Sequence, residues 1–290
     1  MIQIRKKLRS LAAAAVCIVL LFTGLTAAFA QEDAALHLLL IGEDAADVGN
    51  GRSDTMMLAQ IVPATGEIRL VSFLRDTYLP IPGHGYDRLN AAYVYGGKEL
   101  LSQTLTGVFG VRIDRTAKVD FAAMAGIVDR MGGVELEISE AERKALNKIL
   151  NVYCKERGIT PQPLEQSGLV RMNGIQALSY SRVRSLDSDF VRVSRQQNVL
   201  SALLSQAMLL EPYDLLGLAT ECMSNMETDL TLNDLMNLLP LLWQQNGLSL
   251  STARVPFDGT CRDIKVDGKW VLETDTAANA RLLAEFLAED

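Results

Sequence analysis

Three apolar runs lie near the start of the chain, and polar residues stand at their ends. Residues 37–41, 55–62 and 68–73 are rich in Leu, Ile, Val and Met, a pattern typical of β-strands that are buried on both faces. Residues 63–67 read Pro-Ala-Thr-Gly-Glu, which is a turn signal. The second and third strands are therefore predicted to pair as a hairpin.

Further along, apolar residues at helical spacing alternate with short strand-like runs. Helices are predicted at residues 98–109, 121–131, 139–154, 173–180, 191–210, 231–245 and 275–287, and strands at residues 116–120, 134–138 and 248–255. Gly110 is a C-terminal stop for the first helix, and Ser139 with Glu142 forms a capping box for the third. Residues 80–85 and 156–170 each contain two prolines and are predicted to be loops. The pattern predicts an α/β fold with a mixed central β-sheet and helices on both faces, in α-β-α layers.

The N-terminal segment differs from the rest of the chain. Basic residues between Arg5 and Arg9 precede an uncharged apolar run at residues 11–30, which is the pattern of a signal peptide or a signal anchor. A run of about 20 apolar residues can just span a bilayer, so we favour a retained single-pass anchor after a basic cytoplasmic stretch at residues 1–10. The alternative is secretion after cleavage following Ala30. Either way, residues 36–290 are expected to form one extracytoplasmic domain.

Net charge and cysteine content limit the classes of function and the kinds of site that are expected. After the N-terminal segment the chain has 24 basic and 35 acidic residues, a net charge of −11. Bulk charge therefore argues against nucleic-acid binding, and local arginine clusters stand out as anion sites. Three cysteines follow the apolar run, without Cys-x-x-Cys spacing for zinc. A Cys222–Cys261 disulfide and free thiols at Cys154, Cys222 and Cys261 remain the alternatives.

Arginines recur at the ends of the predicted elements. A guanidinium group binds phosphoryl oxygens with two parallel hydrogen bonds and stays charged at any working pH. Arg182 and Arg184 alternate with other residues, so an extended backbone would point both to one side. Arg192, Arg195 and Gln196 share a helix face that we expect to be polar, with Leu200, Leu203 and Leu204 serving the core. The candidate anion-binding set is Arg52, Arg75, Arg88, Arg182, Arg184, Arg192 and Arg195; for each, a solvated charge or a salt bridge is the alternative.

Aspartates stand beside these arginines. Asp44 and Asp54 are candidate ligands for Mg²⁺, with Mn²⁺ as an alternative, because Mg²⁺ binds through one or two carboxylates together with phosphate oxygens. Asp76 follows Arg75 directly and is interpreted as a partner that orients it. Neither His37 nor His84 lies in a motif for nucleophilic catalysis.

A set of motifs in fixed order makes the chain resemble the LytR-CpsA-Psr family between Leu38 and Leu204, whereas residues 211–290 match only loosely. These motifs are Gly42-Glu43-Asp44, Arg52-Ser53-Asp54-Thr55-Met56-Met57, Arg75-Asp76-Thr77, Arg88-Leu89-Asn90-Ala91-Ala92-Tyr93, Val119-Asp120-Phe121, Met131-Gly132-Gly133-Val134, Asn173-Gly174-Ile175-Gln176-Ala177-Leu178, Tyr180-Ser181-Arg182-Val183-Arg184, Asp189-Phe190-Val191-Arg192 and Arg195-Gln196-Gln197. The family usually has lysine at Arg88, where this chain keeps the charge but changes its geometry. The stretch between Arg184 and Arg192 is also short against the family pattern.

The resemblance implies a membrane-anchored phosphotransferase of the cell envelope. Such enzymes move an anionic glycopolymer, of the teichoic acid or capsular polysaccharide type, from a polyprenyl diphosphate carrier onto a peptidoglycan hydroxyl. The expected site has catalytic Arg52, Arg75, Asp76, Arg182 and Arg184, substrate-binding Arg88, Arg192, Arg195 and Gln196, and metal ligands Asp44 and Asp54. Two other functions remain open: a pyrophosphatase that hydrolyses the polyprenyl diphosphate, and a non-catalytic lipid-carrier-binding or regulatory protein.

The polyprenyl tail requires an apolar groove. Candidate lining residues are Tyr93, Val94, Phe121, Met124, Ile127, Leu200 and Leu204, with packing in the core as the alternative for each.

Overall fold

The computed structural model describes residues 35–43, 53–183, 189–207, 226–238 and 249–288, together with residues 210, 214, 217, 218, 220 and 223. The chain divides into two units, residues 1–34 and residues 35–290. The predicted basic stretch at residues 1–10 and the predicted signal segment at residues 11–30 lie outside the described residues. Within the described part, no helix is both long and apolar enough to cross a bilayer.

A six-stranded mixed sheet forms the centre of the second unit. Its strand order is β10 (Ser249–Val255), β3 (Glu67–Phe73), β2 (Ser53–Val62), β1 (Leu36–Glu43), β6 (Arg115–Asp120) and β9 (Glu227–Thr228). β1 pairs with β6 in parallel, as β3 does with β10, and the other neighbours are antiparallel. The predicted β2–β3 hairpin and the mixed sheet are both confirmed.

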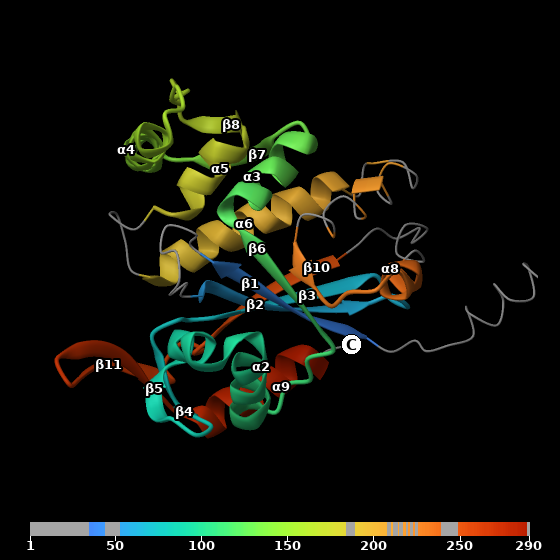
Figure 1. Ribbon diagram of the computed structural model, residues 1–290, viewed down its shortest axis with the longest axis vertical. Coiled ribbons are helices and arrows are strands. Elements are labelled where there is room, and N and C mark those ends of the chain that lie inside the picture. Colours follow the sequence, from blue (N-terminus) through green and yellow to red (C-terminus); the bar gives the residue numbers. More distant parts are fainter. Residues whose placement is uncertain are drawn as a thin grey trace, which may run out of the picture. The chain divides into compact units, whose positions relative to one another are not determined.

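Helices cover both faces of this sheet (Figure 1). On one face, Leu39 and Ile41 pack in a cluster with residues of α2 (Leu89–Phe109) and α9 (Thr276–Ala288). On the other face, Leu38 packs in a cluster with Leu200 of α6 (Asp189–Ala207), and α3 (Phe121–Arg130) lies on the same side. Successive side chains of a strand point to opposite faces, so β1 must be apolar at nearly every position.

A smaller layer lies beyond α3 and α6. It contains the hairpin of β7 (Val134–Ile138) and β8 (Gly168–Met172), with α4 (Glu140–Arg157) and α5 (Gly174–Ser181). The predicted Ser139–Glu142 capping box begins α4, and a second capping box, Asn173 with Gln176, begins α5. The loop prediction for residues 156–170 was wrong at both ends, because α4 continues to Arg157 and β8 begins at Gly168.

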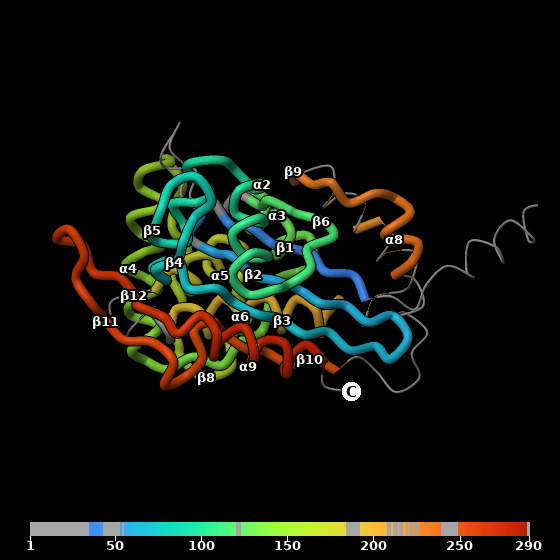
Figure 2. Tube along the Cα trace, turned by 90° about the horizontal axis from the view of Figure 1, so that it is seen from below, coloured from blue at the N-terminus to red at the C-terminus, as the bar shows by residue number. Residues whose placement is uncertain are grey.

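A second, four-stranded sheet was not predicted. Its order is β11 (Cys261–Val266), β12 (Lys269–Thr274), β4 (Thr77–Ile81) and β5 (Gly85–Arg88), and the two hairpins extend near one another in Figure 2. The loop prediction for residues 80–85 is confirmed only for residues 82–84, because β4 continues to Ile81 and β5 begins at Gly85. Pro80 is tolerated in β4 because β12 pairs only with Thr77 and Tyr78, which leaves Pro80 beyond the part of the strand that has two neighbours.

The start of α2 was also missed. The helix begins at Leu89, and Gly96 and Gly97 interrupt it with non-helical backbone angles. Gly97 has φ +64°, a conformation that disfavours other residues. The predicted stop at Gly110 is confirmed, with φ 70°.

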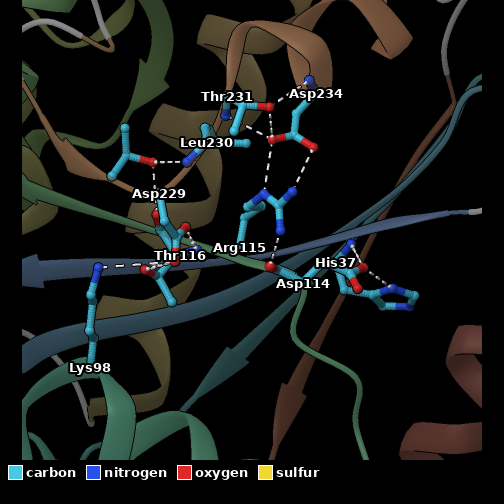
Figure 3. Close-up of polar contacts among 10 residues, drawn as sticks. His37, Lys98, Asp114, Arg115, Thr116, Asp229, Leu230, Thr231 and Asp234 are labelled. Carbon is cyan, nitrogen blue, oxygen red and sulfur yellow. Dashed lines mark hydrogen bonds and ion pairs between the residues drawn. The ribbon is translucent and has the colours of Figure 1, made fainter. Parts of the chain in front are cut away.

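Polar contacts fasten the C-terminal part to the N-terminal end of β6 (Figure 3). Arg115 donates from Nε and Nη2 to the two carboxylate oxygens of Asp234, in α8 (Leu232–Leu238), at 2.9 and 3.2 Å. Thr116 Oγ1 bonds Asp229 Oδ2 at 3.1 Å. Burial raises the pKa of Asp234, but hydrogen bonds from Arg115 and Thr231 outweigh it and lower the pKa. The predicted helix at 231–245 is described only to Leu238, and residues 239–248 lie outside the described part.

Cys154 and Cys261 are free thiols. The predicted Cys222–Cys261 alternative falls on Cys222, which lies outside the described residues.

Candidate functional site

One edge of the central sheet collects the strand ends that carry the polar motifs. In register, Glu43 of β1 lies opposite Ser53 of β2 and beside Asp120 of β6. On the other side, Phe73 of β3 lies beside Val255 of β10. Because β2 runs antiparallel to β1 and β3, its start meets their ends. Asp44 and Arg52 lie outside the described residues, but each is adjacent in sequence to a strand end on this edge, which we call the motif edge.

Arg75, Asp76 and Arg88 form an ion-pair cluster beside the end of β3. Asp76 Oδ2 lies 3.4 Å from Arg75 Nε, and Asp76 Oδ1 lies 3.0 Å from Arg88 Nη1. The backbone holds them together, since the Asn90 N–H donates to the carbonyl oxygen of Arg75 at 3.1 Å. All three side chains are partly exposed. The cluster keeps a net positive charge next to solvent, which suits an anionic ligand.

The beginning of α6 packs against the same edge. Val193 lies in an apolar cluster with Leu74 and Leu272. Gln197 Nε2 donates to Ser72 Oγ and to the carbonyl oxygen of Ala253, both at 3.0 Å. α6 therefore begins beside the residues that precede Arg75.

The predicted polar face of α6 is in fact buried. Arg192 is 2% exposed and Arg195 is 3% exposed. Arg195 Nε donates to Glu142 Oε1 at 2.9 Å, and Arg195 Nη1 donates to the carbonyl oxygen of Val183 at 3.2 Å. Burial raises the pKa of Glu142, but hydrogen bonds from Ser139 and Arg195 outweigh it and lower the pKa. Arg195 thus joins α6 to the capping box of α4.

The structure contradicts the extended backbone predicted around Arg182. Tyr180 and Ser181 are the last residues of α5, and Arg182 is its C-cap with φ −96° and ψ −2°, a helical conformation. Ser181 Oγ donates to the carbonyl oxygen of Leu178 within this last turn, at 2.8 Å. Arg184 lies outside the described residues.

An apolar cavity of about 330 Å³ lies between the sheet and the helices α3, α5 and α6. Its lining includes Gly42, Thr55, Ser181 and Gln196 of the predicted motifs, and Gly42 and Thr55 are cross-strand partners next to the motif edge. The remaining lining is Leu40, Ile41, Met57, Val119, Met124, Ile127, Val128, Met131, Ala177, Leu178, Val199, Leu200, Leu203, Leu204, Ala207 and Met226. The cavity volume falls in the range of small-molecule sites.

Four of the predicted lining residues line the cavity: Met124, Ile127, Leu200 and Leu204. Tyr93 instead packs with the core on the α2 side of the sheet, and Val94 on the same helix is exposed. The side chain of Phe121 is not among those described. Sequence reasoning missed the methionines Met57, Met131 and Met226, whose flexible side chains suit an adaptable apolar wall.

The predicted Mg²⁺ ligands are Asp44 and Asp54. Asp54 is the second residue of β2, while its side chain and the whole of Asp44 lie outside the description. Ser53 is fully buried, and its Oγ has no hydrogen-bond partner within the described part. A pair of carboxylates at one strand end is a donor set that suits Mg²⁺. The described residues contain no group of three His, Cys, Asp or Glu that would hold a metal by itself.

Comparison with known proteins gives consistent matches. A sequence profile described as "LytR_cpsA_psr family" matches residues 16–286. The chain is 39% identical over 173 residues to the probable cell wall biosynthesis protein LcpB of Corynebacterium glutamicum, which covers 58% of this chain and 38% of that protein. It is 29% identical over 211 residues to the polyisoprenyl-teichoic acid–peptidoglycan teichoic acid transferase TagT of Bacillus subtilis, covering 71% and 63%.

Regulatory protein MsrR of Staphylococcus aureus is 32% identical over 176 residues, covering 60% of this chain and 49% of that protein. The chain thus spans 38–63% of the length of these relatives. Among solved structures, TagT bound to LIIa-WTA superposes with a TM-score of 0.70 at 25% identity, covering 88% of this chain and 91% of that one.

Proposed function

This chain belongs to the LytR-CpsA-Psr family, and from that premise we propose that it transfers an anionic glycopolymer from a polyprenyl diphosphate carrier to peptidoglycan. The glycopolymer is of the teichoic acid or capsular polysaccharide type, and the product is a phosphodiester. The observation that carries this proposal is the apolar cavity, whose lining reaches the motif edge at Gly42 and Thr55. A lipid diphosphate has the same two parts, an apolar tail and an anionic head.

The dimensions of the cavity suit the tail. Its lining follows α6 from Gln196 to Ala207, and eleven helical steps extend about 16 Å. Nearly all of the lining is aliphatic or methionine, so it removes a polyprenyl chain from water at little polar cost. The diphosphate would then remain at the end marked by Gly42, Thr55, Ser181 and Gln196.

The arginines bind and orient the head group. Arg75 and Arg182, with Arg52, Arg184 and Arg192, neutralise the diphosphate and the charge that grows on the transferred phosphoryl group. Arg88 extends this set toward the polymer side. The structure gives Arg195 a partner in Glu142, so we assign it to holding α6 in place.

A sugar hydroxyl attacks the polymer-proximal phosphorus, polyprenyl phosphate leaves, and the hydroxyl proton passes to a carboxylate. Both oxygens of Asp76 are engaged by Arg75 and Arg88, which leaves Asp54 as the candidate acceptor and Asp76 as the orienting partner. Asp44 and Asp54 would hold Mg²⁺, which supplies further charge neutralisation at the phosphoryl oxygens when bound.

The proposed reaction also implies where the domain lies in the cell. We place residues 36–290 on the outer side of the cell membrane, where peptidoglycan lies, with residues 11–30 as the anchor. Polyprenyl carriers are membrane lipids, so an anchored enzyme meets its donor substrate at the bilayer surface.

The test is a reconstituted transfer of a lipid-diphosphate-linked glycan to peptidoglycan oligomers. We expect Arg75→Ala and Arg182→Ala each to reduce the transfer rate about 100-fold or more, the usual cost of one lost electrostatic donor. Arg171→Ala is the matched control, because Arg171 is exposed and pairs with Glu135 on the distant β7–β8 hairpin. An unchanged transfer rate in both variants would contradict the role assigned to Arg75 and Arg182.

The alternatives have separate readouts in the same assay. A pyrophosphatase releases phosphate from the lipid at a rate that does not depend on the glycan acceptor. A non-catalytic lipid-carrier-binding or regulatory protein binds polyprenyl diphosphate without turnover in Mg²⁺; the name of MsrR carries only the word regulatory. Acceptor-dependent formation of the phosphodiester distinguishes the proposed transferase from both.

A further inference from the structure

The β11–β12 hairpin of the second sheet runs past the ion-pair cluster at the end of β3. β4 borders β12 only at Leu272 and Glu273, so β11 is the sole paired neighbour of residues 269–271 among the described strands. Leu272 is in parallel register with Thr77, and its N–H donates to the carbonyl oxygen of Asp76 at 2.9 Å. The residues of β12 before Leu272 therefore lie beside the cluster. In both views the hairpin projects beyond the strands that flank it (Figure 1, Figure 2).

Trp270 lies on the face of this hairpin that is turned toward the beginning of α6. Leu272, two positions further along β12, packs in an apolar cluster with Leu74 and Val193. Side chains two positions apart in a strand share a face, so Trp270 lies on the same face as Leu272. Its cross-strand partner is Lys265, whose Nζ lies 6.0 Å from the centroid of the indole ring.

The backbone of Trp270 is held in place, while its ring is open to a ligand. Its carbonyl oxygen accepts a hydrogen bond from Arg88 Nη2 at 2.6 Å. The hairpin turn contains Asp267 with φ +48° and Gly268 with φ +79°, the positive angles of a tight two-residue hairpin turn. The side chain is nevertheless 62% exposed. A ring that is fixed before binding loses little conformational entropy when a ligand packs on it.

Tyr86 is 63% exposed but lies on the opposite face of the second sheet. It is the cross-strand partner of Pro80, whereas Leu272 is in register with Thr77. Thr77 and Pro80 are three positions apart in β4, so their side chains point to opposite faces. Tyr86 is therefore a ring of equal exposure that does not face α6.

Arg88 joins Trp270 to the ion-pair cluster. The same guanidinium group that bonds the carbonyl oxygen of Trp270 also pairs with Asp76, and Asp76 in turn pairs with Arg75. These arginines are the ones proposed to bind the diphosphate of the donor. In a lipid-linked glycan the first sugar is bonded directly to the outer phosphate. A diphosphate held by Arg75 and Arg88 therefore places that sugar beside Trp270.

The hairpin and the arginines contact different parts of such a donor. Asp263 is the cross-strand partner of Leu272, so it shares the face of Trp270 and Lys265, which thus carries one charge of each sign. The attraction for the phosphates comes from Arg75 and Arg88. The indole offers an apolar surface for the C–H face of a sugar ring, while the two charged side chains can bond its hydroxyls.

We propose that Trp270 binds the sugar attached directly to the diphosphate of the anionic donor, and that this contact makes the site select a loaded lipid carrier over a carrier without sugar. This deepens the proposed function and rests on it. Trp270 supplies the packing surface, and Arg88 fixes its position relative to the diphosphate.

The first experiment measures binding without an acceptor and does not depend on transfer. Two ligands of equal charge are titrated into the full chain in detergent: octaprenyl diphosphate esterified with one N-acetylglucosamine, and the methyl ester of octaprenyl diphosphate, which has no sugar. We expect the wild type to bind the glycosyl ester about fivefold more tightly, as for one aromatic contact. Trp270→Ala should bind both ligands equally, with the affinity for the methyl ester unchanged, and Trp270→Phe should keep part of the preference.

Tyr86→Ala is the matched control, because it removes a ring of the same exposure from the opposite face of the same sheet. This variant should keep the fivefold preference. Three results overturn the inference: no preference for the glycosyl ester in the wild type, a preference that survives in Trp270→Ala, or an equal loss of preference in Tyr86→Ala.

The second experiment uses the transfer reaction with the same variants. In Trp270→Ala the KM for the lipid-linked donor should rise about fivefold, while kcat and the KM for the peptidoglycan acceptor stay the same. A rise in the KM for the acceptor alone would overturn the inference, because the ring would then contact the other substrate. Absence of transfer in the wild-type chain, together with sugar-dependent binding that requires Trp270, would refute the proposed function and leave the role of Trp270 standing.

Discussion

The buried ion pair between Glu142 and Arg195 gives a sharp prediction about stability. Arg195 is 3% exposed and Glu142 is 19% exposed at the side chain. Glu142 also accepts hydrogen bonds from the Ser139 N–H and Oγ, both at 2.9 Å. The carboxylate therefore neutralises a buried guanidinium group and caps α4 at the same time.

Removal of Glu142 and removal of Arg195 should lower the free energy of unfolding by different amounts. Glu142→Ala leaves a buried positive charge unpaired, which costs about 3–5 kcal/mol, and the lost cap adds about 1 kcal/mol. Arg195→Met leaves a carboxylate that keeps its bonds to Ser139 and reaches solvent, so we expect only about 1–3 kcal/mol. The double variant should be more stable than Glu142→Ala alone, because no buried charge remains.

Urea unfolding of residues 31–290, followed by circular dichroism and tryptophan fluorescence, measures these differences. Strictly additive free energies in the double variant, or equal costs for the two single variants, would contradict the reasoning. Acid gives a second readout. Because the folded-state pKa of Glu142 is lowered from its ordinary value of 4.5, the contribution of Glu142 to stability is complete above that value and is lost as the pH falls through the folded-state pKa. Glu142→Gln should lose less stability than the wild type between neutral pH and pH ~3.

Further variants address the cavity, the metal and the C-terminal helix. Leu204→Trp fills the cavity and should weaken polyprenyl diphosphate binding at least about tenfold, at a cost of about 1–3 kcal/mol in the free energy of unfolding. Leu232→Trp, on the exposed side of α8, should change neither the binding affinity nor the stability. Chelation of divalent cations should abolish transfer, and Asp54→Asn should raise the Mg²⁺ concentration needed for half-maximal rate; full activity in excess EDTA would refute the metal role. Asp234→Asn weakens the contact with Arg115 and should raise hydrogen exchange in α8 first, and unchanged exchange there would argue that the contact does not hold α8 in place.

Local sequence signals predicted the central elements well. The first three strands, the Ser139 capping box and the stop at Gly110 depend on residues within a few positions of one another, and each is confirmed. The chemical roles given to these motif residues stay predictions.

Contacts between residues far apart in the sequence determine the features that local patterns did not predict. Pro80 argued against a strand, yet β4 forms because the proline lies beyond its pairing with β12. The buried Arg195 pairs with Glu142, which lies 53 residues away in the chain. A local sequence pattern does not predict a partner at that distance. The hydrogen bond from Arg88 to the carbonyl oxygen of Trp270 was missed because the two residues meet only through the second sheet.

The parallel pairing of β3 with β10 has a consequence for how the site comes into being. Phe73, just before Arg75, is in register with Val255, and Arg88 bonds a carbonyl that lies 182 residues further along the chain. Contacts this distant in sequence form late in folding, since a long loop must close before they can stabilise anything. The arginine cluster is thus completed only when almost the whole chain has been synthesised, and a chain that ends before residue 249 should retain α2 and the β2–β3 hairpin but hold Arg75 and Arg88 without their final supports.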